Sequence, residues 1–581
     1  MKQTRPSLLM TLTVLTTLVF SSMRLQAADA VKSERLLPPN VLAYLSIPSI
    51  PALHSGWQES HWGKLQNEPE LVDFLEQFQA QLDIISQGVE KETGTTLNNI
   101  LKIPSGEIAL AVLQLPPNKF AAVGILDFGE KQRTLEILLT KLKEANEAKG
   151  AKLLTEEIDG TTIHIISEDN AGDATDAPQK PEPFKKQFAY FLKDTLLVAG
   201  NDTDALKAVL ARWDGKHDDT FADNKEYKYL IEQCKTGEAE PLVKWYIDPI
   251  GMLTSAVSVG GQQNMQAQMF MGFLPALGIS KIKGIGGAFE LGTEDFSAVS
   301  KTMIYVDLPA SGLLNVFQFP ATDLTPPKWV SAQTSDYYSV NWNVSGAYDA
   351  VEGLVDSFQG PGTVARLLDQ LSMQEGGPGL HLKKDILDQL SGRINVIQDY
   401  PNPDESDKRR ILVGLKVNDV DAVKASLSKV AALPQFPGKV RDFKGTQIYE
   451  IPAELMGQVG GNNLGITIAS ENLMISSDVT LLEQILLADR TNETLADTKE
   501  FKRFAKFFPE KTSMLSFQKQ NVQLKTAYDM LRSGDLGQNV EDVDFSKLPP
   551  FDVIKKYLKP SGSYTEPNER GVIFTGFQLK D

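Results

Sequence analysis

The segment TFADNKEYKYL, residues 220–230, recurs in the same chain as TLADTKEFKRF, residues 494–504, with six of eleven positions identical. In both copies an aspartate, Asp223 or Asp497, stands three residues before a glutamate. This spacing is typical of a capping box, in which the first carboxylate accepts from a helical amide and the second reaches back to the cap. We therefore predict that Asp223 and Asp497 are N-caps, and that the repeated carboxylates are structural rather than catalytic.

Similar segments flank both copies in the same order. The matched pairs are SGEIALAV from Ser105 with SGRINVIQ from Ser391, AAVGILDF around Gly124 with RILVGLKV around Gly414, DGTTIHI around Gly160 with KGTQIYE around Gly445, and DTLLVAGND from Asp194 with ENLMISSDV from Glu471. A fixed order at nearly constant spacing indicates two homologous halves. We expect the halves to superpose with these glycines, and Asp223 and Asp497, on one another.

The junction between the halves is predicted in TDLTPPKWVSAQTS, residues 322–335, because the two adjacent prolines interrupt regular structure. The expected organisation is a signal peptide over residues 1–30, a first domain over residues 31–325 and a second domain over residues 326–581. The first half also carries DNAGDATDAPQKPEP, Asp169–Pro183, which we interpret as a mobile surface loop because it lacks apolar periodicity.

Within each half, β-rich runs occur in pairs with amphipathic helical segments between them. GEIALAV and FAAVGILDF are such a pair, and EKQRTLEILLTKLKEA has its leucines at helical spacing. Paired strands favour an α+β fold of two tandem homologous domains, each a largely antiparallel sheet with packed helices. Each half is also expected to close with a β-hairpin, GIGGAFEL with FSAVSKTMIYVDL and SGSYTE with GVIFTGFQL.

The N-terminus has the order of a secretory signal peptide. Lys2 and Arg5 precede an apolar run over residues 8–20, and small residues follow at 27–30. The run is shorter than the about 20 residues that span a bilayer, so we expect cleavage near residues 28–31 and no stable membrane span afterwards. The protein is predicted to be exported to the periplasm, the cell envelope or the medium.

Net charge and cysteine usage restrict the partners. A formal charge of −17 disfavours nucleic acids and anionic lipid surfaces, because both attract lysine and arginine. The expected partner is an unknown protein or envelope component. Cys234 is the single cysteine, so no intramolecular disulfide forms. We interpret it as a buried apolar residue, and a reactive thiol is the alternative.

Motifs for nucleophilic or nucleotide chemistry are missing from the sequence. It has no GxSxG elbow and no GK[ST] phosphate loop. GIGGAF, residues 284–289, lacks the strand, turn and helix of a nucleotide loop, so its glycines are expected in a strand. The acidic clusters at residues 201–205 and 214–219 lack the EF-hand pattern, and the first is expected to cap a helix.

Two segments leave a metal site open as an alternative. His54 and His61 in HSGWQESHW would share a helix face, but helical metal ligands are more often three or four apart, so we interpret them as surface or interfacial histidines. Met265, Met269 and Met271 could bind Cu(I), form a contact surface or simply pack. No catalytic residue, cofactor or metal ligand is assigned.

The opening of the first half resembles a known group of proteins. LPPNVLAYLSI, residues 37–47, HWGKLQNEPEL, residues 61–71, and ADNKEYKYL, residues 222–230, are similar to segments of an exported bacterial family, found notably in planctomycetes, that carries a domain of unknown function. The resemblance covers most of the first half and, more faintly, the second. It implies export and supplies no catalytic residues.

The sequence favours a non-enzymatic role. The repeated positions are glycines, caps and apolar residues, which serve folding, so the leading hypothesis is an exported protein that acts in binding, envelope structure or assembly. The alternative is an exported hydrolase with its site at the interface between the halves. That alternative predicts titratable residues that converge in a cleft with shifted pKa values.

Overall fold

A computed structural model gives the fold of the chain. It describes residues 31–116, 119–167, 187–215, 217–259, 265–400, 409–456, 462–488, 493–535 and 543–580. The predicted signal peptide, residues 1–30, and the predicted surface loop, Asp169–Pro183, lie outside these residues.

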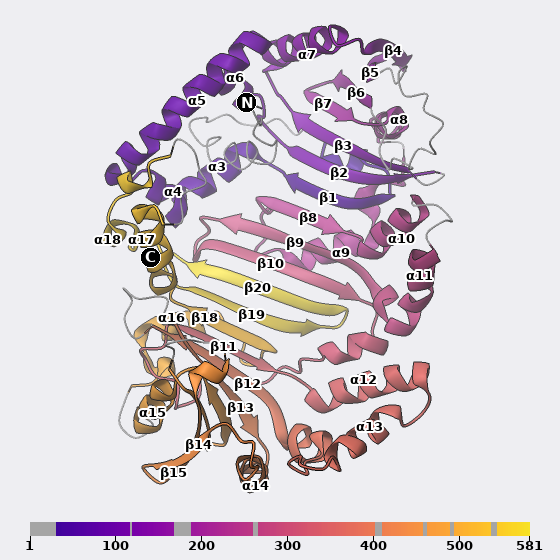
Figure 1. The fold of residues 1–581 in the computed structure, drawn as a ribbon. Helices are drawn as coiled ribbons and strands as arrows, with labels where there is room; N and C mark the ends of the chain where they lie inside the picture. The colour runs from indigo at the N-terminus through magenta and orange to yellow at the C-terminus, as the bar shows by residue number, and fades with distance from the viewer. Residues whose placement is uncertain are drawn as a thin grey trace.

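Within the described residues, twenty strands form one continuous antiparallel sheet (Figure 1). The first ten are β1 (Val41–Ile47), β2 (Ile108–Leu115), β3 (Lys119–Asp127), β4 (Lys152–Ile158), β5 (Thr161–Ser167), β6 (Gln187–Lys193), β7 (Leu196–Gly200), β8 (Val243–Ile247), β9 (Ile282–Leu291) and β10 (Phe296–Val306). The second ten are β11 (Asp336–Asn341), β12 (Leu390–Asp399), β13 (Arg410–Val417), β14 (Lys439–Phe443), β15 (Thr446–Ile451), β16 (Leu464–Ala469), β17 (Asn472–Ser476), β18 (Met514–Gln518), β19 (Ser561–Asn568) and β20 (Gly571–Leu579).

The pairing order of the first ten strands is repeated by the second ten. From its outer edge each half runs β4-β5-β6-β7-β3-β2-β1-β8-β9-β10 or β14-β15-β16-β17-β13-β12-β11-β18-β19-β20. The closing hairpins, β9 with β10 and β19 with β20, are confirmed. The mixed α+β class with antiparallel pairing is also confirmed.

The expectation of a separate sheet in each half is wrong, because β10 pairs with β20 along their length. Figure 1 shows the yellow C-terminal strand β20 beside β10 in the middle of the sheet. Both hairpins have a free outer edge, and the pairing of those edges satisfies backbone groups that would otherwise be exposed. The sheet shows no split between the halves, and the boundary at residue 325 stays a prediction.

The ladder gives a register in which positions of the two halves can be compared. The two-residue turn before β7 closes between Lys193 and Leu196, and the turn before β17 closes between Ala469 and Asn472. The two turns are taken as equivalent, and the paired residues are then followed strand by strand in each half. By this comparison Tyr44 of β1 and Tyr337 of β11 occupy equivalent positions. Positions related in this way are called matched below.

This register confirms part of the sequence alignment. Gly160 and Gly445 are matched, because each is the second residue of a two-residue hairpin turn with positive φ, 72° and 88°. A side chain is strained in that region, and glycine is not. Asp223 and Asp497 also occupy corresponding places, at the ends of the short 3-10 turns Phe221–Asp223 and Leu495–Asp497.

Two of the aligned strand segments are shifted by one residue. The ladder matches Gly414 with Ile125, so Gly124 lies on the opposite face of its strand from Gly414. Asp194 is matched with Ser470 rather than with Glu471. A shift of one residue exchanges the two faces of a strand, and both segments are apolar on both faces, so the apolar pattern did not fix the register.

The predicted N-caps are also displaced by one residue. Asn224 caps the first helix, accepting from Tyr227 N at 2.8 Å, and Thr498 caps the second. Asp223 and Asp497 instead accept from the hydroxyls of Thr220 and Thr494, at 2.9 and 2.6 Å. The 3-10 turn uses one further residue before the helix begins, which moved each cap from the aspartate to its neighbour.

Helices cover parts of both sheet faces and gather along its two long sides (Figure 1). They are α2 (Ser33–Leu36), α3 (Ile50–Glu59), α4 (His61–Gln66), α5 (Val72–Thr93), α6 (Leu97–Leu101), α7 (Gln132–Glu147), α8 (Thr203–Leu210), α9 (Lys225–Cys234), α10 (Pro249–Val259), α11 (Met265–Leu277), α12 (Val344–Gln359), α13 (Thr363–Ser372), α14 (Val420–Ala431), α15 (Val479–Ala488), α16 (Lys499–Ala505), α17 (Gln520–Ser533) and α18 (Phe551–Ile554). The first core packs α8 and α9 on the sheet, and the second packs α15 and α16 on the same face. We call this the core face and the other the open face.

The predicted junction packs into the second core. Pro326 and Pro327 lie outside helices and strands, as predicted, while Trp329 and Val330 are buried. The Val330 carbonyl accepts from Leu495 N, just as the Leu37 carbonyl accepts from Phe221 N. These bonds extend the matched positions to the segment before β1, with Leu37 in the place of Val330.

Candidate functional site

A polar cavity of about 1440 Å³ lies beside α2 and α9, at the side of the first half. Its lining is almost balanced in charge and includes Lys32, Glu34, Asp223, Lys228, Lys244 and, from the second half, Arg570. The cavity is the place where titratable residues of the described chain gather. It is therefore the first candidate for a functional site.

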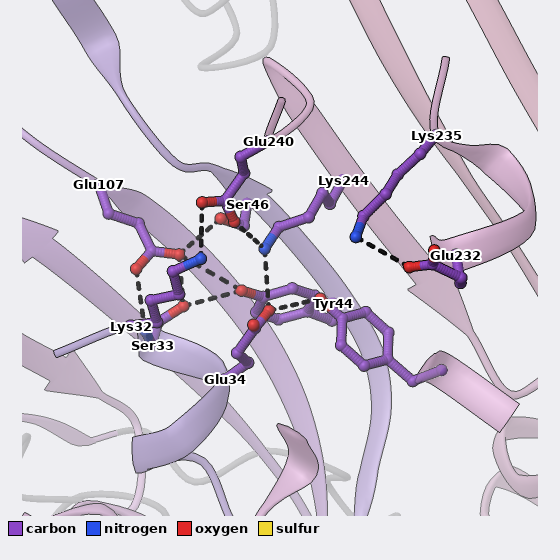
Figure 2. Close-up of polar contacts among 11 residues, drawn as sticks. Lys32, Ser33, Glu34, Tyr44, Ser46, Glu107, Glu232, Lys235, Glu240 and Lys244 are labelled. Atoms are coloured by element: carbon purple, nitrogen blue, oxygen red, sulfur yellow. Dashed lines mark hydrogen bonds and ion pairs between the residues drawn. The ribbon is translucent and has the colours of Figure 1, made fainter. Parts of the chain in front are cut away.

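A buried ion-pair network forms one wall of the cavity (Figure 2). Lys244 on β8 is only 5% exposed, and its Nζ lies 2.9 Å from a carboxylate oxygen of Glu34 and 2.7 Å from one of Glu240. Glu240 pairs also with Lys32, at 2.7 Å. β8 turns alternate residues to the core face, and this alternation places the lysine inward.

A second carboxylate beside the network binds the N-terminal helix to the sheet. The oxygens of Glu107 accept from Ser33 N at 2.8 Å, from Ser33 Oγ at 2.6 Å and from Ser46 Oγ at 2.6 Å. The Tyr44 hydroxyl lies between Ser33 and Glu107. Figure 2 shows these side chains pointing toward one another from α2, from β1 and from Glu107, which directly precedes β2.

The protonation states of the network are those of a structural ion pair. Burial disfavours the charged form of Lys244, but its two carboxylate partners raise its pKa above the ordinary value. Burial acts against the ionised form of Glu240, but hydrogen bonds from Lys244 and Lys32 lower its pKa. Burial raises the pKa of Tyr44 and of Tyr227, whose hydroxyl donates to Glu34 at 2.6 Å. Lysine stays charged, tyrosines stay neutral, and the network holds α2 and α9 on the sheet.

The second half keeps the tyrosine and serine but changes their acceptor. Tyr337 and Ser339, matched with Tyr44 and Ser46, both donate to Asn395 Oδ1, at 2.9 and 3.0 Å. An amide on β12 thus does in the second half what the carboxylate of Glu107 does in the first. The hydroxyls are satisfied in both halves, as buried polar groups require.

An apolar groove of about 670 Å³ is hollowed in the open face of the first half. Small residues, Ala122, Gly124 and Ala199, form part of its floor. Large apolar side chains stand around it, namely Leu45, Leu110, Phe188 and Trp245. Leu110 is 56% exposed although it lies in the middle of β2. An apolar hollow lined by exposed large residues is typical of a binding surface.

One polar residue, Asn201, stands at the groove. Its Oδ1 accepts from Ala122 N at 2.7 Å, while its Nδ2 is buried and has no hydrogen-bond partner. An orphaned donor is costly in an apolar setting unless a ligand supplies an acceptor. The groove therefore offers apolar contact and one hydrogen bond.

The open face of the second half has large residues at the matched floor positions. Ala122, Gly124 and Ala199 correspond to Ile411, Val413 and Ile475. These side chains occupy the space that the small residues leave open. The groove is consequently a property of the first half.

The structure does not bring His54 and His61 together. They lie on separate helices, α3 and α4, and not on one helix face. His61 is buried, with Nε2 3.1 Å from the carbonyl of Leu579 in the second half, so of the two predicted places this residue has the interfacial one. His54 Nε2 lies 2.9 Å from Gln58 Nε2, and burial lowers the pKa of His54.

The remaining candidates have structural places. Cys234 is buried against Gly286, and burial raises the pKa of its thiol to about 12, which confirms the buried apolar residue. Asp202 caps α8 by accepting from Asp204 N, as predicted for its cluster. The glycines of residues 284–289 lie in β9, as predicted.

Other predicted ligands remain apart or lie partly outside the description. In the cluster at residues 214–219, Asp219 pairs with Arg212. Met269 and Met271 lie on α11, Met269 exposed, and the side chain of Met265 lies outside the described residues. Across the part of the chain that the structure describes, no three His, Cys, Asp or Glu side chains are placed to hold a metal ion.

In comparisons with known proteins, no family model, curated protein or solved structure matches this chain. Within the described residues, no helix combines the length and hydropathy needed to cross a membrane.

The sequence analysis predicted neither the groove nor the ion-pair network. The one available signal was Lys244 at an inward position of the apolar strand VKWYI.

Proposed function

We propose that the protein is an exported, non-enzymatic binding protein whose apolar groove takes a long apolar chain that ends in a hydrogen-bond acceptor, as a fatty acid does. The observation that carries the proposal is the groove, with its small-residue floor and the single unpartnered donor of Asn201. Ligand pockets are commonly 300–1000 Å³, largely apolar, with a few polar groups that fix orientation. This groove has those properties.

The energetics favour such a ligand. Each methylene that leaves water contributes about 0.8 kcal/mol, so a chain lying across the groove gains several kcal/mol. The Asn201 amide then fixes the polar end. The acidic net charge does not oppose the binding of a mainly apolar ligand, as it would oppose a nucleic acid.

A groove-filling variant tests the proposal. Ala122→Ile, Gly124→Val and Ala199→Ile together install the residues of the matched floor in the second half. A β-carbon at Gly124 meets nothing closer than 3.4 Å, so the strand accepts a side chain there. Binding of a dansyl-labelled fatty acid, followed by its fluorescence, should be lost while the circular dichroism spectrum is retained.

A matched pair of single variants controls for general surface effects. Leu110→Ala removes a groove wall and should weaken binding by about tenfold. Val396→Ala, at the matched position of the second half, should leave binding unchanged. Fatty-acid binding that survives the filled floor would contradict the proposed function.

The hydrolase alternative stays a separate prediction. It needs titratable groups at the interface of the halves, and Arg570 does reach the polar cavity from the second half. The carboxylates of Glu34 and Glu240 in that cavity are paired with lysines. Turnover of chromogenic ester, peptide and phosphoester substrates by the purified protein, removed by Lys244→Met, would support the alternative over the binding role.

We also infer that the halves are two homologous domains that meet near residue 325, and that residues 1–30 are removed on export. The repeated strand order and the matched hairpin turns support the first inference. The charged, apolar and small-residue order of the N-terminus supports the second. Mass spectrometry of the exported protein should find a mature N-terminus near residues 28–31, and an intact Met1 would contradict it. The resemblance to the exported family stays a prediction.

A further inference from the structure

A small polar cavity lies under the core face of the second half, on the opposite side of the sheet from the groove. It has a volume of about 290 Å³, and its lining includes Trp329, Arg393, Lys416, Glu471 and Asn472. A water molecule in the liquid occupies about 30 Å³, so a single water does not fill it. The cavity has room for a molecule of several non-hydrogen atoms.

Two side chains in the lining carry polar atoms that the protein leaves unpaired. Trp329 is 2% exposed and Asn472 is 5% exposed, and neither Trp329 Nε1 nor Asn472 Oδ1 has a hydrogen-bond partner. The amide orientation of Asn472 is fixed, because its Nδ2 donates to the Ser470 carbonyl at 2.5 Å. One buried donor and one buried acceptor thus remain unused at the same cavity.

The first half fills the matched place with hydrocarbon. Asn472 is matched with Leu196, and Gly414 is matched with Ile125. Val330 is matched with Leu37 through their carbonyl hydrogen bonds, so the residue before it, Trp329, is matched with Leu36. Leu36, Ile125 and Leu196 are all buried in the first core. The fold therefore does not require a cavity here.

In the second half Gly414 makes room for the indole of Trp329, which lines the cavity. A β-carbon at this position would lie 2.9 Å from Trp329 Cζ2 and 3.6 Å from Asn472 Oδ1. A side chain at Gly414 would therefore displace the indole. Since a buried unpaired donor or acceptor costs about 1–3 kcal/mol, the arrangement is unfavourable for stability unless something binds.

Charged groups at the cavity indicate the ligand's charge. Lys328, Arg393 and Lys416 are cations in the lining, and Glu471 is an anion. Arg393 already donates to the carbonyls of Asp323 and Thr325, which fixes its guanidinium in place. The excess of positive charge favours a carboxylate, whose oxygen can also accept from Trp329 Nε1.

We propose that this cavity binds a small carboxylate with a hydrogen-bond donor on the neighbouring carbon, the shared chemistry of α-hydroxy and α-amino acids. The carboxylate accepts from Trp329 Nε1 and faces the cations. The hydroxyl or ammonium group donates to Asn472 Oδ1, and an ammonium group would also face Glu471. The site is independent of the apolar groove.

Calorimetry with three probes of one carbon skeleton tests the assignment. L-lactate carries a hydroxyl, L-alanine an ammonium group, and propionate neither. At least one of the first two should bind the full-length mature protein with a millimolar or lower Kd, and propionate at least about tenfold more weakly. The stronger of the two distinguishes a hydroxy acid from an amino acid.

Variants of the lining residues test whether the measured heat of binding comes from this cavity. Trp329→Phe keeps the ring without the donor, and Asn472→Leu removes the acceptor at nearly constant size. Each should weaken binding by about tenfold or more while the protein stays folded, and Asn472→Leu should not lower the melting temperature. Leu196→Met, at the matched position of the first half, should bind as the wild type does.

Three outcomes would overturn the proposal. They are the absence of heat with both L-lactate and L-alanine, equal binding of propionate, and binding that is unchanged in both Trp329→Phe and Asn472→Leu. A crystal structure of the protein soaked in the tighter probe provides a measurement that does not depend on the variants. Water alone between Trp329 and Asn472 in that structure would also overturn it.

Discussion

The two halves repeat one strand order but are hollow on opposite faces of the sheet. The first half has small residues on the open face and a groove there, whereas large residues occupy the matched floor of the second half. On the core face the relation reverses. Leu36, Ile125 and Leu196 pack the first core, whereas Trp329 and Asn472 line a small cavity in the second half. A paired frame of strands thus fixes backbone positions and leaves the side chains free to open either face.

The halves differ also in how they hold the segment before their first strand. In the first half this segment is held by charged groups: Glu34 pairs with Lys244, and Ser33 donates to the carboxylate of Glu107. The second half carries Leu515 at the position matched with Lys244. Packing of Leu324 and Val330 then replaces the charges. The following predictions test how far these differences matter.

The largest expected effect comes from replacing Lys244 by its matched residue. Lys244→Leu leaves Glu34 and Glu240 without their buried partner, and this type of change costs about 3–5 kcal/mol in the free energy of unfolding. Urea denaturation measures it. Adding Glu34→Gln should recover part of the loss. The control Lys228→Ala breaks an exposed ion pair with Asp223 and should change the free energy of unfolding by no more than about 0.5 kcal/mol. If the control lost as much stability as Lys244→Leu, burial would not be the reason for the effect at Lys244.

A reciprocal exchange at matched positions should have unequal effects. Leu196→Asn puts an amide into an apolar core and should destabilise the protein by about 3 kcal/mol. Asn472→Leu removes an unpaired acceptor and should be neutral or stabilising by about 1 kcal/mol, measured by thermal unfolding without ligand. Equal destabilisation by both changes would show that the two cores are alike.

The helix caps should behave alike in the two halves. Asn224→Ala and Thr498→Ala each remove the side chain that caps its helix and should cost about 1 kcal/mol by chemical denaturation. Asp223→Ala and Asp497→Ala should cost less, because each of these side chains accepts from one threonine hydroxyl and caps no helical amide. A larger loss of stability in Asp223→Ala and Asp497→Ala than in the cap variants would show that the aspartates are the N-caps.

The smallest effect is an acid dependence that belongs to the first half. The pKa of Glu240 is lowered in the folded state, so its stabilisation is present at neutral pH and is lost as the pH falls through the lowered pKa. The contribution should stay below about 1 kcal/mol, because the Glu240 side chain is 35% exposed. Melting temperatures from about pH 7 to about pH 3 should fall less in Lys244→Leu than in the wild type. Parallel curves would contradict this assignment.

The candidate sites were largely beyond sequence reasoning, since each is assembled from distant segments. The ion-pair network joins residues 34, 240 and 244, and the neighbouring carboxylate of Glu107 comes from the segment just before β2. The small cavity of the second half is lined by Trp329, Arg393 and Asn472, which come from three separate segments. Within its own segment each of these residues fits an ordinary strand, turn or loop. Only their convergence distinguishes them.

The sequence by itself determined the local structure. It predicted the mixed α+β class, paired antiparallel strands, the two closing hairpins and the correspondence of Gly160 with Gly445. These features follow from residue preferences over short stretches, because a turn, a strand or a cap involves neighbouring residues. For the same reason the N-caps of α9 and α16 were predicted to within one residue.

Tertiary structure alone decided three features: the continuous sheet, the strand register and the hollows. β10 (Phe296–Val306) and β20 (Gly571–Leu579) are far apart in the sequence, and each was predicted only as part of the closing hairpin of its own half. Gly414 was aligned with Gly124 because strands that are apolar on both faces give no periodic signal, and contact with Trp329 determines its true place. Pairing between distant edges and packing between layers depend on shape in three dimensions, which residue order along the chain does not specify.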